Sequence, residues 1–258
     1  MTGFTTRNYP QLLRYRQEGL QKVGARFPDE IERPIARRFF PTVWHKSANN
    51  DYPSITIGPW RVGGAGPSVV LAHEAMAGRS SISVLDVGCA AGTFRHYLRL
   101  REPERTIAYC GVDIAPPAVD FPLYPSVSAV TKNDFDLIFM SEIAEHMTAD
   151  AFIEECLAPA SRLLRTDGIV IVGVPNPLAP AVLQRDITHV QHYPWYDLYA
   201  ILRFFFDDVD VIRTHFVYGP RRFLSLPLRT SLAYFLEVDW CEGLTAIARG
   251  PRRSLPRS

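Results

Sequence analysis

The stretch VLDVGCAAG, residues 84–92, is the part of the sequence from which the fold can be inferred. Its first half belongs to an apolar run, 82–87, which is short enough for a buried parallel strand, and a helix is expected to begin at Thr93. Gly88 and Gly92 let the backbone turn sharply and let a ligand approach the main chain closely. Because ligands of open α/β sheets bind at the carboxyl ends of strands, this strand–loop–helix unit predicts a binding loop. A purely structural strand-to-helix turn is the alternative.

Apolar runs and helical segments alternate on both sides of this unit. The pattern predicts strands at 107–114, 137–140, 169–174, 209–217 and 244–248, and helices at 93–100, 148–164, 196–205 and 224–236. Thr148 is the expected N-cap of the second helix. Such alternation indicates an α/β fold with a mostly parallel, Rossmann-like sheet and helices on both faces.

The composition excludes several other classes of protein. The 258 residues include 28 Lys and Arg against 27 Asp and Glu, so there is no basic excess for non-specific binding of nucleic acid. No apolar run reaches the roughly 18–20 residues that span a bilayer, and the N-terminus lacks the apolar core of a signal peptide. The four cysteines are scattered, without a CxxC pair. We therefore expect reduced, mostly buried thiols and a cytoplasmic location.

The acids around the loop indicate which ligand it binds. Ala90 and Ala91 replace the pattern GxGxxG of nicotinamide enzymes, which disfavours an oxidoreductase. Asp86 precedes the first glycine, where a carboxylate would repel a pyrophosphate but would suit a cationic sulfonium and an amino group. Asp113 closes the next strand and is placed to accept hydrogen bonds from ribose hydroxyls. The sequence thus favours S-adenosylmethionine as the cofactor.

From about residue 68 to 249 the sequence resembles the class I S-adenosylmethionine-dependent methyltransferases. The matching segments are VLDVGCAAG, GVDI, FDLIFMSEIAEHM, LLRTDGIVIVGVPNP and GLTAIARGP. The resemblance implies a seven-stranded sheet whose last two strands form an antiparallel hairpin. It also implies a set of cofactor contacts: Asp86, Gly88, Cys89, Ala90, Gly92, Asp113, Ile114 and Ser141.

The sequence departs from the family pattern in one segment. Phe135 follows Asp113 too closely for the usual helix and full strand, and the gap contains Pro116, Pro117 and Pro122. We therefore expect a truncated third strand, and the usual adenine contact there is not assigned. The division expected from the sequence is an N-terminal helical and loop extension (1–67), which caps the active site, and a methyltransferase domain (68–258). In the extension, the spacing predicts a helix over 11–26 with Leu12, Leu13, Leu20 and Val23 on one face.

The segment Glu142-Ile-Ala-Glu145-His146 follows a strand and so lies at the carboxyl edge of the sheet. A later segment, DITHVQHYPW (186–195), returns to the same edge. Such glutamates can serve as cofactor or substrate contacts without a metal, and this alternative stays open. ExxEH followed by a late histidine resembles metal-dependent small-RNA 2′-O-methyltransferases and ubiquinone-pathway O-methyltransferases. That resemblance implies four ligands, Glu142, Glu145, His146 and His189, for Mg²⁺ or Mn²⁺, although Fe²⁺ and Co²⁺ also suit these donors.

A bound cation would explain methyl transfer to oxygen, because it lowers the pKa of a coordinated hydroxyl. Glu145 is expected to be needed for turnover, and His192 or Asp186 is expected to accept the proton. An exposed structural histidine is the alternative for His192. The segment DITHVQHY also looks like those of bacterial glycan and natural-product methyltransferases, which favours a saccharide or other small-molecule hydroxyl as acceptor. An RNA 2′-O-methyltransferase and a non-catalytic cofactor-binding partner protein are the alternative functions.

Overall fold

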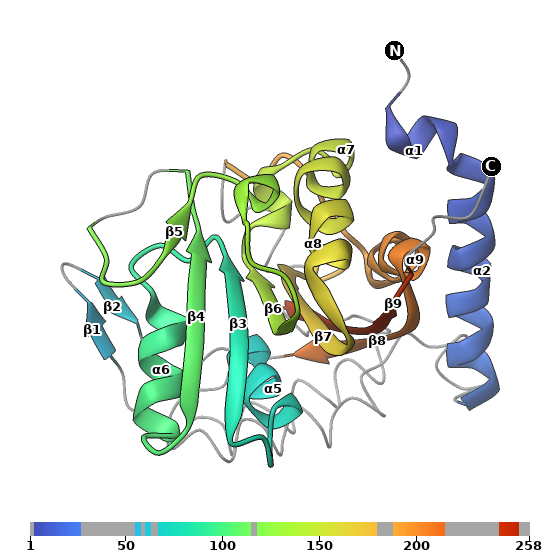
Figure 1. The fold of residues 1–258 in the computed structure, drawn as a ribbon. Helices are drawn as coiled ribbons and strands as arrows, with labels where there is room; N and C mark the ends of the chain where they lie inside the picture. Colours follow the sequence, from blue (N-terminus) through green and yellow to red (C-terminus); the bar gives the residue numbers. More distant parts are fainter. Residues whose placement is uncertain are drawn as a thin grey trace.

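A computed structural model describes residues 3–26, 55–57, 60–62, 67–114, 118–179, 188–214 and 243–252. Its centre is a seven-stranded sheet with the strand order β5-β4-β3-β6-β7-β9-β8 (Figure 1). Strands β5, β4, β3, β6 and β7 run parallel, whereas β9 is antiparallel to both β7 and β8. The predicted Rossmann-like sheet with an antiparallel C-terminal pair is thereby confirmed. The strands are β3 (Ser81–Val87), β4 (Thr106–Val112), β5 (Leu123–Tyr124), β6 (Phe135–Ser141), β7 (Leu164–Pro175), β8 (Phe206–Thr214) and β9 (Gly243–Pro251).

Helices cover both faces of the sheet, and the alternation of side chains along β3 shows why. Val84 belongs to an apolar cluster with residues of α5 (Pro67–Ala75) and α6 (Thr93–Arg101). Leu85 and Val87 point the other way, into the larger cluster with α7 (Ala149–Ala151), the π-helical turn η3 (Phe152–Leu157), α8 (Ala158–Leu163) and α9 (Trp195–Phe205). A central strand with both faces buried reads as a continuous apolar run, as 82–87 does.

The helix predicted over 148–164 is present as the continuous series α7, η3 and α8. Thr148 is its N-cap, since its hydroxyl oxygen accepts a hydrogen bond from the Ala151 amide at 3.2 Å. This contact satisfies one of the amide groups that a helix start leaves without a helical partner. The helix ends at Leu163, and β7 begins at the next residue. Two short 3-10 turns, η1 (Val127–Ala129) and η2 (Ala144–His146), flank the end of the sheet where the parallel strands terminate.

The third strand is truncated, as expected. Strand β5 has only two residues, and these pair with Gly111 and Val112 at the end of β4. The Gly111 amide also donates to the carbonyl oxygen of Pro122 at 2.9 Å. The described part of the proline-rich segment therefore pairs with the sheet at the carboxyl end of β4, beside the predicted binding loop.

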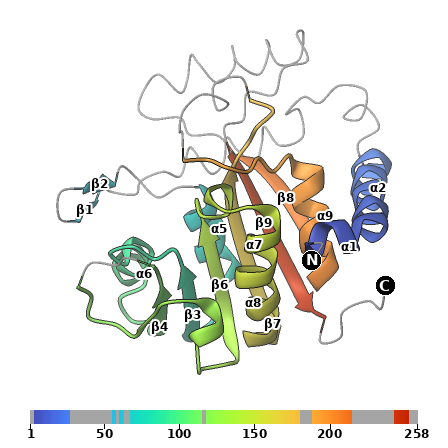
Figure 2. The same ribbon diagram turned by 90° about the horizontal axis from the view of Figure 1, so that it is seen from above.

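The N-terminal helices α1 (Phe4–Arg7) and α2 (Tyr9–Arg26) pack beside α9 (Figure 2). Helix α2 is present as predicted, and along it Tyr15 is buried whereas Leu20 is exposed. Tyr15 is buried because its ring meets Phe204 edge to face and its hydroxyl accepts from Arg252. A small antiparallel pair, β1 (Ile55–Ile57) and β2 (Trp60–Val62), belongs to the same extension. The rest of 27–66 lies outside the described residues, so the cap stays a prediction.

Among the described residues, no helix is long and apolar enough to cross a membrane. Cys89, Cys110 and Cys156 are free and buried, in keeping with the expected reduced thiols. The helix predicted at 224–236 lies outside the described residues.

Candidate cofactor and metal site

The loop after β3 is a tight turn held by the neighbouring strand. The amides of Gly88 and Cys89 both donate to the carbonyl oxygen of Val112, at 2.8 and 3.2 Å. Gly88 and Gly92 have φ angles of 76° and 79°, in the left-handed region that favours glycine. Gly92 directly precedes α6, so the turn leads straight into a helix N-terminus. The loop therefore exposes main chain at the carboxyl edge of the sheet, as the sequence predicts.

Two acids approach this loop from adjacent strands. Asp113, just after β4, accepts a hydrogen bond from the Ala90 amide through Oδ2 at 2.9 Å. Asp86, near the end of β3, is only 4% exposed and accepts a hydrogen bond from the Tyr109 hydroxyl. Burial raises the pKa of Asp86 to about 7; the bond from Tyr109 opposes this shift and the charge of Asp113 adds to it. Negative charge thus lies on both sides of the glycine turn.

Other predicted cofactor contacts lie around the same turn. Cys89 is buried in the loop, and Ser141 ends β6, the strand next to β3. Ile114 is 94% exposed, immediately after Asp113.

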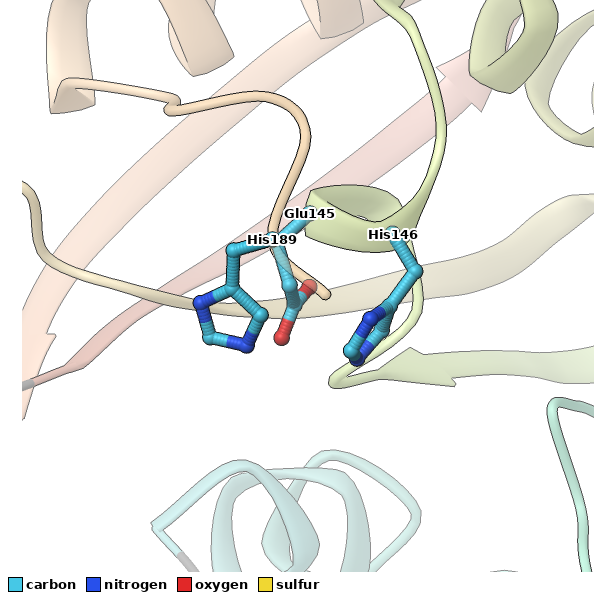
Figure 3. Close-up of side chains that lie close together, drawn as sticks. All are labelled: Glu145, His146 and His189. Atoms are coloured by element: carbon cyan, nitrogen blue, oxygen red, sulfur yellow. The ribbon is translucent and has the colours of Figure 1, made fainter. Parts of the chain in front are cut away.

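The metal-ligand prediction concerns a second cluster at the same edge. Ligand atoms of Glu145, His146 and His189 all lie within 4.8 Å of one another (Figure 3). Glu145 and His146 belong to η2, whereas His189 comes from the segment before α9. The amides of Val190 and Gln191 donate to the Glu145 carbonyl oxygen, at 2.8 and 3.1 Å. Main-chain hydrogen bonds therefore join residues that are 45 and 46 positions apart in the sequence.

The two imidazole rings of this cluster lie edge to face, with centroids 4.9 Å apart. Nδ1 of His146 lies 3.0 Å from the Thr188 hydroxyl. A hydrogen bond at one ring nitrogen fixes the ring and leaves the other nitrogen available as a ligand. One carboxylate and two imidazoles are donors that fit a divalent first-row metal.

Glu142, the fourth predicted ligand, lies outside this group of three but is close to it. Burial and the Glu145 charge raise the pKa of its carboxyl to about 8, and His146 acts in the opposite direction. Its φ of 57° lies in the left-handed region, and its amide donates to the Gly173 carbonyl oxygen at 2.9 Å. The main chain thus turns at Glu142, directly after β6.

The two predicted proton acceptors differ in what the structure shows. His192 is exposed and is not part of the three-residue cluster. Asp186 lies outside the described residues. Neither is given a role by the geometry, and both remain predictions.

Three residues around the site were not predicted from the sequence as functional. Tyr109 contacts Asp86 across strands, Thr188 contacts His146, and Ile143 lies against the glycine turn. A Cβ built on Gly88 would lie 2.1 Å from Cγ2 of Ile143, so only glycine permits this approach. The positions of two of them in the sequence could have indicated a role. Tyr109 stands on the strand that precedes Asp113, and Ile143 lies inside the ExxEH segment.

The strand order, the glycine turn and the acid closing β4 together define a class I S-adenosylmethionine-dependent methyltransferase. The family model described as "Methyltransferase domain" matches residues 13–211, and the chain belongs to that family. The match begins within α2, so it includes part of the N-terminal extension.

Solved structures with the same fold are distant in sequence. A methyltransferase dependent on S-adenosylmethionine from Archaeoglobus fulgidus is 17% identical, with a TM-score of 0.52 over 72% of this chain and 92% of that one. The small RNA methyltransferase HEN1 is 20% identical, with a TM-score of 0.51 over 74% of this chain but only 26% of that one. At such identities the likeness concerns the fold alone. No curated protein matches the sequence.

Proposed function

We propose that this methyltransferase acts on oxygen with the help of a divalent cation, and that its acceptor is a hydroxyl of a saccharide or another small natural product. The observation that carries the proposal is the convergence of Glu145, His146 and His189 within 4.8 Å at the edge of the sheet where the cofactor loop lies. Glu142, whose carboxyl lies near enough to that of Glu145 for the two charges to interact, adds a second carboxylate to this place. Adjacent carboxylates repel each other, and a cation between them relieves the repulsion.

The proposal assigns the cofactor to the glycine turn. Asp113 would bind the ribose hydroxyls, and Ile114 would lie against the adenine. Gly88, Cys89, Ala90 and Gly92 would contact the methionine part through the main chain, with Asp86 beneath them and Ser141 at the neighbouring strand end. Each of these residues lies at the carboxyl edge of β3, β4 or β6, where ligands of such sheets bind.

The proposed metal site would lie beside this turn, because Ile143 of the ExxEH segment packs on Gly88. Glu145, His146 and His189, with Glu142, would hold Mg²⁺ or Mn²⁺. The ion would lower the pKa of a bound hydroxyl and fix the acceptor by chelating two neighbouring oxygens. The residues of the chain then orient the reacting oxygen for in-line attack on the methyl group, and alignment is the main source of acceleration in such a displacement. His192 or Asp186 would accept the proton.

The metal site is tested by binding and by turnover together. We expect Mn²⁺ to bind the wild-type protein, His189→Ala to weaken this binding at least about tenfold, and chelator to abolish methyl transfer until Mg²⁺ or Mn²⁺ is added back. His96→Ala, which removes an exposed histidine of α6 outside the cluster, is the matched control and should keep Mn²⁺ affinity. Full activity in chelator would reject the assisting cation.

The acceptor is tested with labelled cofactor and a panel of hydroxylated compounds. We expect transfer to sugars or glycosides that carry two neighbouring hydroxyls, and loss of transfer when one of the two is removed. A short RNA with a free 3′ end belongs in the panel. Its selective methylation would favour an RNA 2′-O-methyltransferase over a saccharide methyltransferase. Cofactor binding without transfer to any acceptor, with metal bound, would favour a non-catalytic partner protein.

A further inference from the structure

The negative charge beneath the cofactor loop has an unusual setting. Asp86 is buried in β3, and its register partners are Gly111 on β4 and Phe139 on β6, neither of which is charged. In the described part of the chain, the polar and charged groups that act on its carboxyl are the hydroxyl of Tyr109 and the acid Asp113, and neither is cationic. The nearby thiol of Cys89 stays neutral, because burial and both acids raise its pKa to about 12. The site therefore holds a carboxylate that lacks a cation from the described chain.

The Tyr109 hydroxyl donates a hydrogen bond to this carboxylate. Tyr109 stands two residues before Gly111, so it lies on the same face of the sheet as Asp86 and diagonally opposite it. A hydrogen bond to a charged group is stronger than one between neutral groups, and a buried carboxylate has few other means of stabilisation. Tyr109 is thus the group that favours the charged form of Asp86.

The ring of Tyr109 is itself fixed by the shortened third-strand segment. Phe121 meets it edge to face, with centroids 5.0 Å apart. A Cβ on Gly111 would lie 2.5 Å from Sγ of Cys89 and 2.7 Å from Phe121, so these two side chains fill the space that this glycine leaves. On the outer side, Arg95 of α6 lies over Phe121 with its guanidinium carbon 5.1 Å from the ring centroid, and it pairs with Asp120. The orientation of the hydroxyl therefore depends on a packed series of side chains that ends at the surface.

We propose that Tyr109 is a positioning residue, which holds Asp86 as an oriented carboxylate below the loop and so makes the site prefer S-adenosylmethionine over S-adenosylhomocysteine. In the reaction the methyl group leaves the sulfonium sulfur, which keeps the bonding electron pair and becomes a neutral thioether. A fixed negative charge in a poorly hydrated place attracts the sulfonium of the cofactor, whereas the sulfur of the product is neutral and the amino group is common to both ligands. The charge thus favours binding of the methyl donor and release of the product. The proposal rests on the cofactor assignment but not on the metal or the acceptor.

The test is the ratio of the two affinities, measured by calorimetry between pH 6 and 9. At pH 7.5 we expect Tyr109→Phe to weaken S-adenosylmethionine about tenfold and S-adenosylhomocysteine less than about twofold, because loss of a charge-assisted hydrogen bond raises the pKa of the carboxyl by about 1–2 units. The preference should return near pH 9, where Asp86 ionises again. Both ligands carry the same amino group, so its titration cancels in the ratio.

Two further variants separate positioning from simple structural support. Asp86→Asn should remove both the preference and its pH dependence, and adding Tyr109→Phe to it should change nothing more. Tyr15→Phe, which also removes the hydrogen-bonded hydroxyl of a buried tyrosine, should leave the ratio unchanged. An equal loss for both ligands in Tyr109→Phe, without recovery at high pH, would overturn the proposal. So would an unchanged ratio in Asp86→Asn, even if Tyr109→Phe did not fold. Failure of the wild-type protein to bind either ligand would instead reject the cofactor assignment.

Discussion

The carboxyl of Asp86 is buried, and its burial makes the stability of the protein depend on pH. Its pKa rises from 3.8 in the unfolded chain to about 7 in the folded protein, so the folded state binds more protons between these values. The contribution of Asp86 to stability is therefore fully present below pH 3.8 and is lost as the pH rises through about 7. A function that needs a charged group here is thus expected to lower the stability of the ligand-free protein at neutral pH.

The corresponding prediction concerns Asp86→Asn in the absence of cofactor. Relative to wild type, we expect the free energy of unfolding of this variant to improve by roughly 2 to 3 kcal/mol between pH 5 and pH 8, because the amide does not titrate. Urea unfolding at the two pH values measures the difference. Asp120→Asn is the control, since Arg95 lowers the pKa of this exposed carboxyl and any effect should have the opposite sign. A constant difference between Asp86→Asn and wild type across the pH range would contradict the prediction.

For individual residues, the sequence indicates the candidate site residues but not the side chains that contact them. Glu145, His146 and His189 could be named because their residue types and their places after strands point to one edge of the sheet. The hydrogen bond from Tyr109 to Asp86 could not be predicted. A tyrosine in an apolar strand looks like a core residue until the register of the two strands is known. The burial of Tyr15 in α2 was likewise not predictable, since helical periodicity does not tell which side of a helix meets a neighbour.

At the scale of elements, the most informative contact joins the glycine turn to the ExxEH segment. Both follow parallel strands that are neighbours in the sheet, β3 and β6, so their first residues necessarily meet. Gly88 makes the contact close, because Ile143 occupies the position that a Cβ would need. The cofactor loop and the proposed metal ligands are thereby placed by one packing contact.

We therefore predict that Gly88→Ala weakens S-adenosylhomocysteine binding by more than tenfold, as the new methyl group and Ile143 cannot share the same space. Combining it with Ile143→Ala should recover part of that loss by removing the obstructing side chain, although the strain of alanine at φ 76° remains, about 1 kcal/mol or more. Calorimetry on the two single variants and the double variant gives the comparison. If the double variant is as weak as Gly88→Ala alone, steric contact with Ile143 is not the cause of the loss.

The positions of the elements were largely predictable, because the signals that set them are local. The apolar runs gave β3, β4 and β6, and Thr148 marked the start of the helix that follows η2. The close spacing of Asp113 and Phe135 gave the truncated third strand. The effect of this truncation depends on contacts between distant residues. Phe121 packs against Gly111 and Tyr109, and such a contact can be seen only in the folded sheet.

At the scale of the whole molecule, the N-terminal helices are tied to the sheet through α9. Glu18 of α2 accepts hydrogen bonds from the Tyr199 hydroxyl at 3.0 Å and from Nε of Arg203 at 2.8 Å. Lys22 donates to the Val209 carbonyl oxygen of β8, the outermost strand on that side, at 2.9 Å. Arg252, after β9, donates to Tyr15. Helix α2 is thus tied to α9, to β8 and to the residue after β9.

These contacts predict that α2 unfolds before the sheet when Glu18 is replaced. Glu18→Ala should lower the free energy of unfolding by about 1 to 3 kcal/mol, because the buried hydroxyl of Tyr199 and the half-buried guanidinium of Arg203 lose their shared acceptor. Hydrogen exchange should then rise in α2 before it rises in β3, β6 or β7, whose amides are protected by the central sheet. Gln17→Ala, at an exposed neighbouring position, should leave the exchange of α2 unchanged. A uniform increase in exchange across helix and sheet would mean that α2 and the sheet unfold as one unit, and the N-terminal segment would then be an integral part of the domain.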